Sequence, residues 1–339
     1  MSSVFVTTGC RVVEAPARGT GESVRIPVFF GTDRQPTGRG TPSKYFGAER
    51  GDPHRGVCEV SVPRDHRMGE YEIRWGRRGD PSTPDTHVLL LSLKTLAADP
   101  FRLELSREAG GKPVFVYIHG YNTTFDDAIR RTAQLAYDLG FDGTPLCWSW
   151  ASEGNILEYL KDERAVEKTV APLRQFLLDV IEQSGATAVH LIAHSMGNRA
   201  LLGALEKVEG RRFGEVVHAA PDVDADEFAR RVVWTSQTAR RTTLYASSRD
   251  YALQASKTVH LGPRAGDSGE GILVVPMIDS IDVSAVDTSL LGHSYYGDCT
   301  SVVCDLGVLL RERTPVERRP NLELRTKPEG RWWVFKPGP

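Results

Sequence analysis

The stretch that decides the fold reads Val189-His190-Leu191-Ile192-Ala193-His194-Ser195-Met196-Gly197, an apolar strand pattern that runs directly into a serine. A serine held on a tight turn between a strand and a helix carries its Oγ away from the sheet, and that turn needs small residues on both sides. Gly197 meets this need on one side. Ala193 stands where glycine is more usual and adds one methyl group. The stretch predicts a nucleophile elbow with Ser195 at its tip, provided that a helix follows.

A helical pattern does follow the serine. Apolar residues recur at spacings of three and four over residues 198–208, which is the period of a helix with one buried face. The alternative interpretation is that Ser195 is only a small residue that punctuates a turn. The strand before it and the helix after it together favour the elbow.

Buried strands alternate with amphipathic helices from Pro113 onward. This alternation is typical of a mostly parallel sheet that is covered by helices on both faces. We expect strands at residues 114–118, 145–150, 215–219 and 242–246, with one more within 271–286. We expect helices at residues 126–139 and 155–183, the second broken near Pro172 because proline lacks a backbone donor.

The first 110 residues have a different character. They are rich in glycine, proline and arginine, and short alternating runs at residues 58–62, 71–75 and 87–93 predict hairpins and edge strands. We therefore divide the chain into an N-terminal β-rich extension (1–110), a catalytic core (111–310) and a C-terminal tail packed on the core (311–339). We expect the extension to join the sheet of the core.

Composition excludes several function classes. The 339 residues carry a net charge of −2, whereas a general nucleic-acid binder needs a basic face. No apolar run approaches the length of a membrane span, and the start lacks the features of a signal peptide. We expect a cytoplasmic protein, unless a longer amino end carries an export signal. The oligomeric state is not readable from the sequence.

The five cysteines favour a reducing compartment, because their number is odd and they are scattered along the chain. Cys299 and Cys304 are the only two that lie near each other. Their spacing would permit a disulfide in an exported protein, but they have no companions at zinc-site spacing. We expect no metal and no cofactor.

A serine hydroxyl needs an imidazole to accept its proton and a carboxylate to orient that imidazole. Three histidines follow Ser195. His218 lies within a strand pattern, where a hydrogen-bonded core histidine is the commoner role, and His260 ends a helical stretch. His293 sits behind a glycine in a loop after the last strand region, so we favour it as the base and keep His260 as its competitor.

Two aspartates are candidates for the orienting acid. Asp250 ends a loop just past the second strand after the elbow strand, which is the expected place for the acid in a serine–acid–histidine chain order. Asp222 also follows the end of a strand and is the alternative. A calcium loop over Asp222-Val223-Asp224-Ala225-Asp226 fails, because Glu227 stands where such a loop needs glycine. We read these aspartates as a polar loop and a helix start.

Fixed N–H donors must meet the charge that develops on the substrate oxygen. We expect one donor to be the Met196 amide, directly after the nucleophile. The other is expected from the loop after the strand at 114–118, where His119 and Gly120 let the backbone turn and present the Tyr121 amide. His194 and Gly197 complete the supporting set around the serine.

Several segments together resemble a bacterial α/β-hydrolase family long catalogued as a domain of unknown function, over roughly residues 25 to 310. The segments are Phe29-Phe30-Gly31-Thr32-Asp33-Arg34, Tyr117-Ile118-His119-Gly120-Tyr121-Asn122, Ser149-Trp150, Ala193-His194-Ser195-Met196-Gly197, Ala220-Pro221-Asp222 and Gly292-His293-Ser294. The resemblance implies an α/β-hydrolase fold, a Ser195, Asp250 and His293 triad and esterase-like activity. It implies no particular substrate.

The sequence thus predicts a serine hydrolase that cleaves small-molecule carboxylic esters with short or medium acyl groups. Tyr121, Phe125, Trp150 and Tyr159 are expected to make the mouth of the site apolar. Thioesterase, amidase or acyltransferase chemistry would use the same residues. A non-catalytic scaffold that binds a ligand or a partner is the alternative from another class.

Two charged features have no catalytic role that the sequence explains. Thr32-Asp33-Arg34 is expected to form a salt bridge or a cap that stabilises the N-terminal extension. Asp162 is expected on a helix near the mouth, either lining the pocket or on a solvated helical face.

Overall fold

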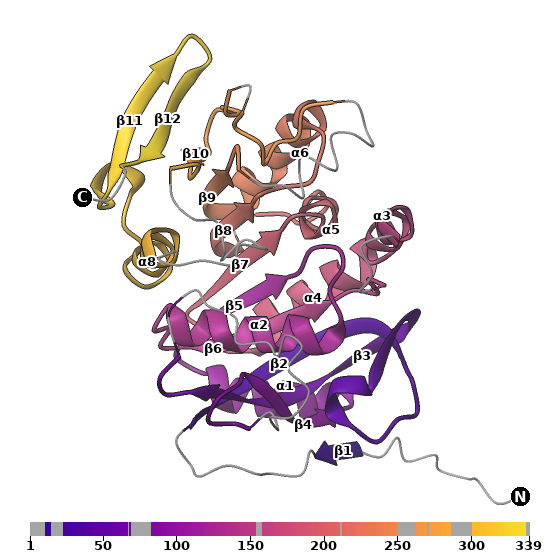
Figure 1. Cartoon of the computed structure of the whole chain (residues 1–339). Coiled ribbons are helices and arrows are strands. Elements are labelled where there is room, and N and C mark those ends of the chain that lie inside the picture. The colour runs from indigo at the N-terminus through magenta and orange to yellow at the C-terminus, as the bar shows by residue number, and fades with distance from the viewer. Residues whose placement is uncertain are drawn as a thin grey trace, which may run out of the picture.

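A computed structural model describes residues 11–14, 23–66, 68, 83–153, 158–210, 212–249, 262–269, 271–285 and 300–336. Within this part of the chain the strands form one twelve-stranded sheet, in the order β1-β4-β3-β2-β6-β5-β7-β8-β9-β10-β12-β11 (Figure 1). The strands are β1 (Arg11–Glu14), β2 (Ser23–Pro36), β3 (Phe46–Pro63), β4 (Leu89–Thr95), β5 (Pro113–Ile118), β6 (Thr144–Ser149), β7 (Ala188–His194), β8 (Phe213–Ala219), β9 (Ala239–Ala246), β10 (Asp279–Asp282), β11 (Leu322–Lys327) and β12 (Gly330–Phe335).

The centre of the sheet is parallel. Strands β2, β6, β5, β7, β8, β9, β10 and β12 pair in parallel. Helices connect most of the central strands, as parallel neighbours require. The main helices are α1 (Ala98–Ala109), α2 (Phe125–Asp138), α3 (Tyr159–Lys168), α4 (Val170–Gln183), α5 (Gly197–Leu205), α6 (Ala225–Thr238) and α8 (Thr300–Gly307).

Both faces of the sheet are buried, and alternate residues of one strand face opposite cores. On β5, Val116 belongs to a core that also contains Phe176 of α4 and Leu201 of α5. The next residue, Tyr117, belongs to a second core together with Leu135 of α2. This alternation follows from the two-residue period of a strand. The predicted α/β architecture with helices on both faces is therefore correct.

The N-terminal extension joins the sheet in antiparallel fashion, as expected. Strands β1, β4, β3 and β2 pair antiparallel in succession. The far side of β2 pairs in parallel with β6, over Phe29–Thr32 against Leu146–Ser149. Strand β2 thus connects the extension directly to the centre of the molecule. The expected strand at residues 71–75 lies outside the described residues.

The long helix expected over residues 155–183 is two helices, and the break falls at Thr169 rather than at Pro172. Thr169 is fully buried, and its Oγ1 accepts a hydrogen bond of 3.0 Å from the indole Nε1 of Trp148. Pro172 lies in the first turn of α4, where the missing N–H has no intrahelical acceptor in any case. The other expected helices and strands in the core lie within a few residues of their predicted limits.

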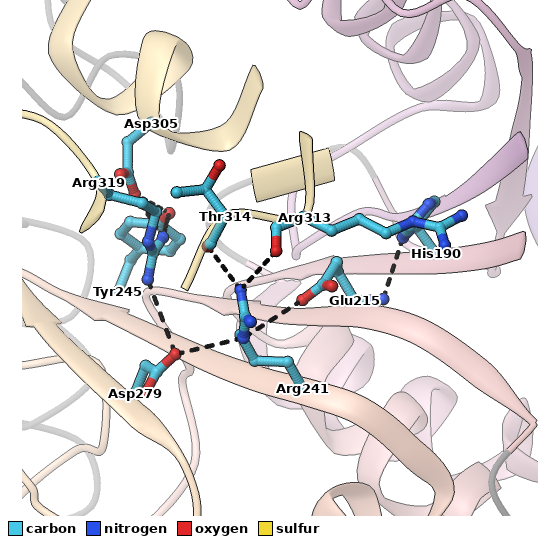
Figure 2. A network of polar contacts seen from close by, with 9 residues as sticks. All are labelled: His190, Glu215, Arg241, Tyr245, Asp279, Asp305, Arg313, Thr314 and Arg319. Atoms are coloured by element: carbon cyan, nitrogen blue, oxygen red, sulfur yellow. Dashed lines mark hydrogen bonds and ion pairs between the residues drawn. The ribbon is translucent and has the colours of Figure 1, made fainter. Parts of the chain in front are cut away.

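The C-terminal residues form the hairpin β11–β12, which extends the sheet beyond β10. A network of buried polar groups ties the segment before this hairpin to the sheet (Figure 2). Arg319 Nη1 lies 2.8 Å from a carboxylate oxygen of Asp305, and that oxygen also accepts from the Tyr245 hydroxyl. Arg241 of β9 donates to the Thr314 carbonyl at 2.6 Å.

Among the residues that the structure describes, no helix is long and apolar enough to span a bilayer.

Candidate active site

Ser195 occupies the turn between β7 and α5, as the sequence predicts. Its φ of +49° lies in the left-handed region, which costs a non-glycine residue roughly 1–2 kcal/mol. Hydrogen bonds on both sides hold this conformation. The Ser195 N–H donates to Ala219 O of β8 at 2.9 Å, and Ser195 O accepts from the Asp222 amide at 3.2 Å. The side chain is largely buried, with 7% of its surface exposed.

The loop after β5 packs directly against this turn, and two glycines permit the contact. A Cβ on Gly197 would lie 2.4 Å from His119 O, and a Cβ on Gly120 would lie 2.9 Å from Ser195 Cβ. No side chain fits in either place. The elbow and the His-Gly loop are therefore in van der Waals contact, as expected from the sequence.

Asn198 and His218 support the elbow from below. The Asn198 side-chain amide donates to the carbonyls of Ala193, Ser195 and Ala219 at 3.0–3.3 Å. Its Oδ1 lies 2.8 Å from His218 Nδ1, which must donate because Nδ2 of Asn198 is already the donor toward the carbonyls. His218 is fully buried, and burial lowers its pKa to about 3. His218 is a neutral, hydrogen-bonded core histidine, as its position within a strand pattern favours.

Met196 is the N-cap residue of α5, so its amide belongs to the first N–H groups of that helix. Such groups have no acceptor within the helix. The Ser195 amide already donates to Ala219 O. The Met196 amide is the next one along the chain after the serine. Its place fits the predicted oxyanion donor.

The predicted second donor, Tyr121, lies in a loop whose backbone is held at successive positions. Asn122 has a φ of +53°, and its N–H donates to Asp162 Oδ2 at 3.0 Å. The Thr123 N–H donates to Ser152 Oγ at 3.1 Å. Thr124 then begins α2 with a capping box in which its hydroxyl accepts from the Asp127 N–H. Hydrogen bonds therefore fix the backbone of this loop at Asn122, Thr123 and the start of α2.

Asp162 is fully buried, so it does not lie on a solvated face of α3. Besides the Asn122 N–H it accepts hydrogen bonds from Ser152 Oγ at 2.5 Å and from the Glu153 N–H at 2.8 Å. Its carboxylate connects the loops that follow β5 and β6. The sequence predicts that Asp162 lies near the mouth of the site, but it does not predict that this carboxylate connects the two loops.

His119 lies beneath the loop, with its ring stacked on Trp150 at a centroid distance of 5.1 Å. Its Nδ1 lies 2.7 Å from Gly120 O and its Nε2 lies 3.3 Å from Ser149 Oγ. A carbonyl only accepts, so Nδ1 carries the proton and Nε2 accepts from Ser149. Burial and the nearby Arg34 charge lower the pKa of His119 to about 3. The ring is therefore neutral at physiological pH.

Asp222 follows β8 and lies beside the elbow. Its Oδ2 accepts a 2.6 Å hydrogen bond from the Tyr159 hydroxyl, and its Oδ1 lies 3.4 Å from Arg264 Nε. All of Asp222 except 2% of its surface is buried. Two residues later, Asp224 caps α6 by accepting from the Asp226 and Glu227 amides. The predicted polar loop and helix start are confirmed here.

Two of the four aromatic side chains expected at the mouth of the site belong to the core instead. Tyr121 and Tyr159 form an edge-to-face pair with centroids 5.3 Å apart beside the elbow. Phe125 and Trp150 are buried to 99% or more and belong to the core instead. In the core, the indole Nε1 of Trp150 donates a hydrogen bond to His119 O at 2.8 Å.

A cavity of about 230 Å³ lies between the start of α6 and the turn of the β11–β12 hairpin. Arg264, Asp267 and Lys327 contribute charged groups to its lining. Ser195 is not among the lining residues, so this cavity does not mark the candidate active site.

Asp250, His293 and His260 lie outside the described residues. Their strands are described: β9 ends at Ala246, four residues before Asp250, and β10 ends at Asp282, eleven residues before His293. In the sheet these two strands are the second and third beyond the elbow strand. The acid and the base therefore stay as predictions.

The sequence predicts a stabilising salt bridge or cap at Thr32-Asp33-Arg34, but it does not predict the contacts that Arg34 makes near the elbow. Asp33 does form the expected ion pair within the extension, with Arg50 at 3.2 Å. Arg34, however, is 99% buried and hydrogen-bonds to Ser149 at the end of β6 and to residues in the loops after β5 and β6. The available signal was a charged pair directly after the apolar run of β2.

A family model described as "Alpha/beta hydrolase of unknown function (DUF900)" matches residues 97–313, which is more than half of the chain. A search of curated proteins gave no match.

Among solved structures, the chain is similar to an uncharacterized protein from Bacillus cereus ATCC 10987, with 12% identity, a TM-score of 0.40 and coverage of 61% of each chain. The chain thus spans about three fifths of that protein. It is also similar to an acetyl xylan esterase from Paenibacillus sp. R4, with 12% identity, a TM-score of 0.35 and coverage of 85% of this chain and 84% of that one. An esterase from Pyrococcus furiosus matches with 12% identity, a TM-score of 0.28 and coverage of 45% and 70%.

The family match covers the elbow, the His-Gly loop and the strands between them, and the fold agrees with its description. The chain therefore belongs to this family of α/β hydrolases of unknown function.

Proposed function

We propose that the protein is a serine hydrolase that cleaves carboxylic esters with short or medium acyl groups through an acyl-enzyme intermediate. Ser195 Oγ attacks the ester carbonyl carbon while His293 accepts the hydroxyl proton. His293 then gives that proton to the departing alcohol. Water, activated by the same imidazole, attacks the acyl carbon and releases the acid and the free serine.

One observation carries the proposal: Ser195 sits in a left-handed conformation on the strand–helix turn, with the His-Gly loop packed against it. A merely structural turn has no need of a strained serine, because glycine adopts this conformation without cost. Strain of this kind concentrates at functional sites. The amides of Met196 and Tyr121 are the proposed donors to the oxyanion.

Asp250 is the proposed orienting acid. Strands β9 and β10 run parallel to the elbow strand β7, so the chain leaves them at the same edge of the sheet that carries Ser195, and Asp250 and His293 follow these strands in the sequence. Asp222 already accepts from the Tyr159 hydroxyl and faces Arg264. These contacts support a role for Asp222 in holding Tyr159 beside the elbow, and Asp222 stays the alternative acid.

The test compares hydrolysis of p-nitrophenyl esters from acetate to palmitate by the wild type and by Asp250→Asn and Asp222→Asn. Loss of the orienting carboxylate lowers kcat on the order of 10⁴-fold in the best-studied triad. We expect a loss of this order for Asp250→Asn and a smaller one for Asp222→Asn. His293→Ala and His260→Ala separate the two candidate bases in the same assay. If Asp222→Asn is the more damaging change in folded protein, the assignment of the acid is wrong.

A further inference from the structure

Arg34 comes from the N-terminal extension, yet its side chain reaches the loops around the elbow. It lies in β2, two residues beyond Thr32, the last residue of this strand that pairs with β6. Its Nε donates to Ser149 Oγ at 2.9 Å, and its Nη2 donates to Thr123 O at 2.7 Å. Its Nη1 donates to the carbonyls of Gly47 and Ser152 at 3.0 and 2.9 Å.

A buried guanidinium is costly unless its donors are used and its charge is balanced. Burial lowers the pKa of Arg34 to about 10, against the opposing effect of the Asp33 and Asp162 carboxylates. The group therefore stays charged at neutral pH. Its planar fork binds acceptors from separate loops at once, which the single ammonium of a lysine cannot reproduce.

The contact with Ser149 continues toward the elbow. Arg34 Nε–H donates to Ser149 Oγ, the Ser149 hydroxyl donates to His119 Nε2, and His119 Nδ1–H donates to Gly120 O. The two ends set the direction of these hydrogen bonds, because the guanidinium only donates and the carbonyl only accepts. The neutral state of the His119 ring is the state that this arrangement requires.

The end of this relay is the peptide unit between Gly120 and Tyr121. In a trans peptide the C=O and the following N–H point in opposite directions. A hydrogen bond that fixes Gly120 O therefore also fixes the direction of the Tyr121 N–H. The same guanidinium holds the loop on its other side through Thr123 O.

We propose that Arg34 is a positioning residue that aims the Tyr121 amide, directly through Thr123 and indirectly through Ser149 and His119. The inference rests on the proposed function, because it needs the Tyr121 amide to bind a developing oxyanion. It assigns the N-terminal extension a part in the reaction. Arg34 itself does not touch the substrate.

The test uses Arg34→Lys and Ser149→Ala in the full chain. Removing one oxyanion donor costs about 10²–10³ in kcat, and a donor that is misaimed but present should cost less. We expect kcat to fall about 10- to 100-fold in Arg34→Lys and about 10-fold in Ser149→Ala, with KM within about twofold of the wild type. Ser149→Ala removes only a hydroxyl and keeps the test valid if Arg34→Lys does not fold.

A second readout separates positioning from general destabilisation. Phenyl trifluoromethyl ketone adds to an active serine and places an oxyanion where the ester oxygen would be. Its Ki should rise in each variant by about the same factor as kcat/KM falls. A loss of folded protein alone would lower the amount of active enzyme and leave this Ki unchanged.

Matched controls come from the same chain. Arg241→Lys alters another arginine that donates to loop carbonyls, Thr314 O and Arg313 O, away from the elbow. Ser184→Ala removes another buried hydroxyl, one that accepts from the Ala186 N–H at the end of α4. Neither control should change kcat or the Ki of the ketone.

Two results would overturn the inference. If Ser149→Ala and Arg34→Lys keep wild-type kcat and Ki, or shift them no more than the controls do, Arg34 is a structural residue only. If the folded wild type neither hydrolyses esters nor reacts at Ser195, the proposed function itself fails and takes this inference with it. The wild-type measurement thus distinguishes the two failures.

Discussion

At the scale of single residues, the site depends on close approach between two backbone segments. Gly197 faces the carbonyls of His119 and Ile118, and a Cβ there would lie 2.4 and 2.8 Å from their oxygens. Backbone cannot move aside as a flexible side chain can. The glycine two residues after the serine is therefore required by the His-Gly loop as well as by the helix start.

Gly197→Ala should consequently destabilise the fold and displace the proposed oxyanion loop. Overpacking of this kind typically costs 1–3 kcal/mol. Urea unfolding should show a loss in this range, together with a fall in kcat. Gly40→Ala is the control, because no atom lies within 4 Å of a Cβ at Gly40. Equal stability of the two variants would contradict the close approach.

His218 gives the stability a specific pH dependence. Burial lowers its pKa from 6.5 to about 3 in the folded protein. Below pH 6.5 the unfolded chain therefore binds a proton at His218 that the folded protein does not bind. The contribution of the neutral His218 to the free energy of unfolding is fully present above pH 6.5. It is lost as the pH falls toward 3, by at most about 1.4 kcal/mol per pH unit.

His218→Asn tests this sign, since its amide can replace the Nδ1–H donor toward Asn198 but does not titrate. The stability advantage of the wild type over the variant should shrink as the pH falls from 6 to 4. Urea unfolding at each pH measures it. A difference that stays constant or grows on acidification would contradict a neutral buried imidazole.

At the scale of secondary-structure elements, the C-terminal segment is held to the sheet by charges as well as by packing. Arg319 and Asp305 are both almost fully buried, and Arg319 also lies 3.8 Å from Asp279 of β10 (Figure 2). Desolvation raises the pKa of Asp305, while the Arg319 charge opposes this shift. Removing one partner would leave the other charge buried and uncompensated.

Arg319→Met should therefore destabilise the protein by about 3–5 kcal/mol in urea unfolding, the usual loss when one partner of a buried ion pair is removed. The double variant Arg319→Met with Asp305→Leu should recover part of this loss. Arg325→Ala is the control, because Arg325 and Glu323 form a pair on the surface of β11, where such pairs contribute about 0–1 kcal/mol. A loss for Arg319→Met no larger than for the control would show that the network does not hold the segment.

The sequence predicts most of these elements because period and burial determine them together. The strands and helices from Pro113 to Ala246 follow from alternating apolar runs and helical spacing. The break at Thr169 does not follow from the pattern, and at this residue the structure shows a tertiary hydrogen bond from Trp148 that local sequence does not reveal. Local propensity pointed to Pro172, and proline is tolerated in a first turn.

At the scale of the whole molecule, the candidate site is assembled where several parallel strands end. Strands β5, β6, β7 and β8 deliver the His-Gly loop, Ser149, Ser195 and Asp222 to one edge of the sheet. Chain order alone predicts that the His-Gly loop and Ser195 lie close together. Chain order could not predict the contacts of Arg34 near the site, because Thr123 and Ser152 lie 89 and 118 positions later in the chain. These residues come within its reach where β2 pairs with β6.

The central claim is that Ser195 is the nucleophile. Its most direct test is mass-spectrometric mapping of the residue modified by a fluorophosphonate in the folded full-length protein. We predict modification at Ser195 in the wild type and none in Ser195→Ala. A folded wild type that stays unmodified, or one modified at another serine, would contradict the account.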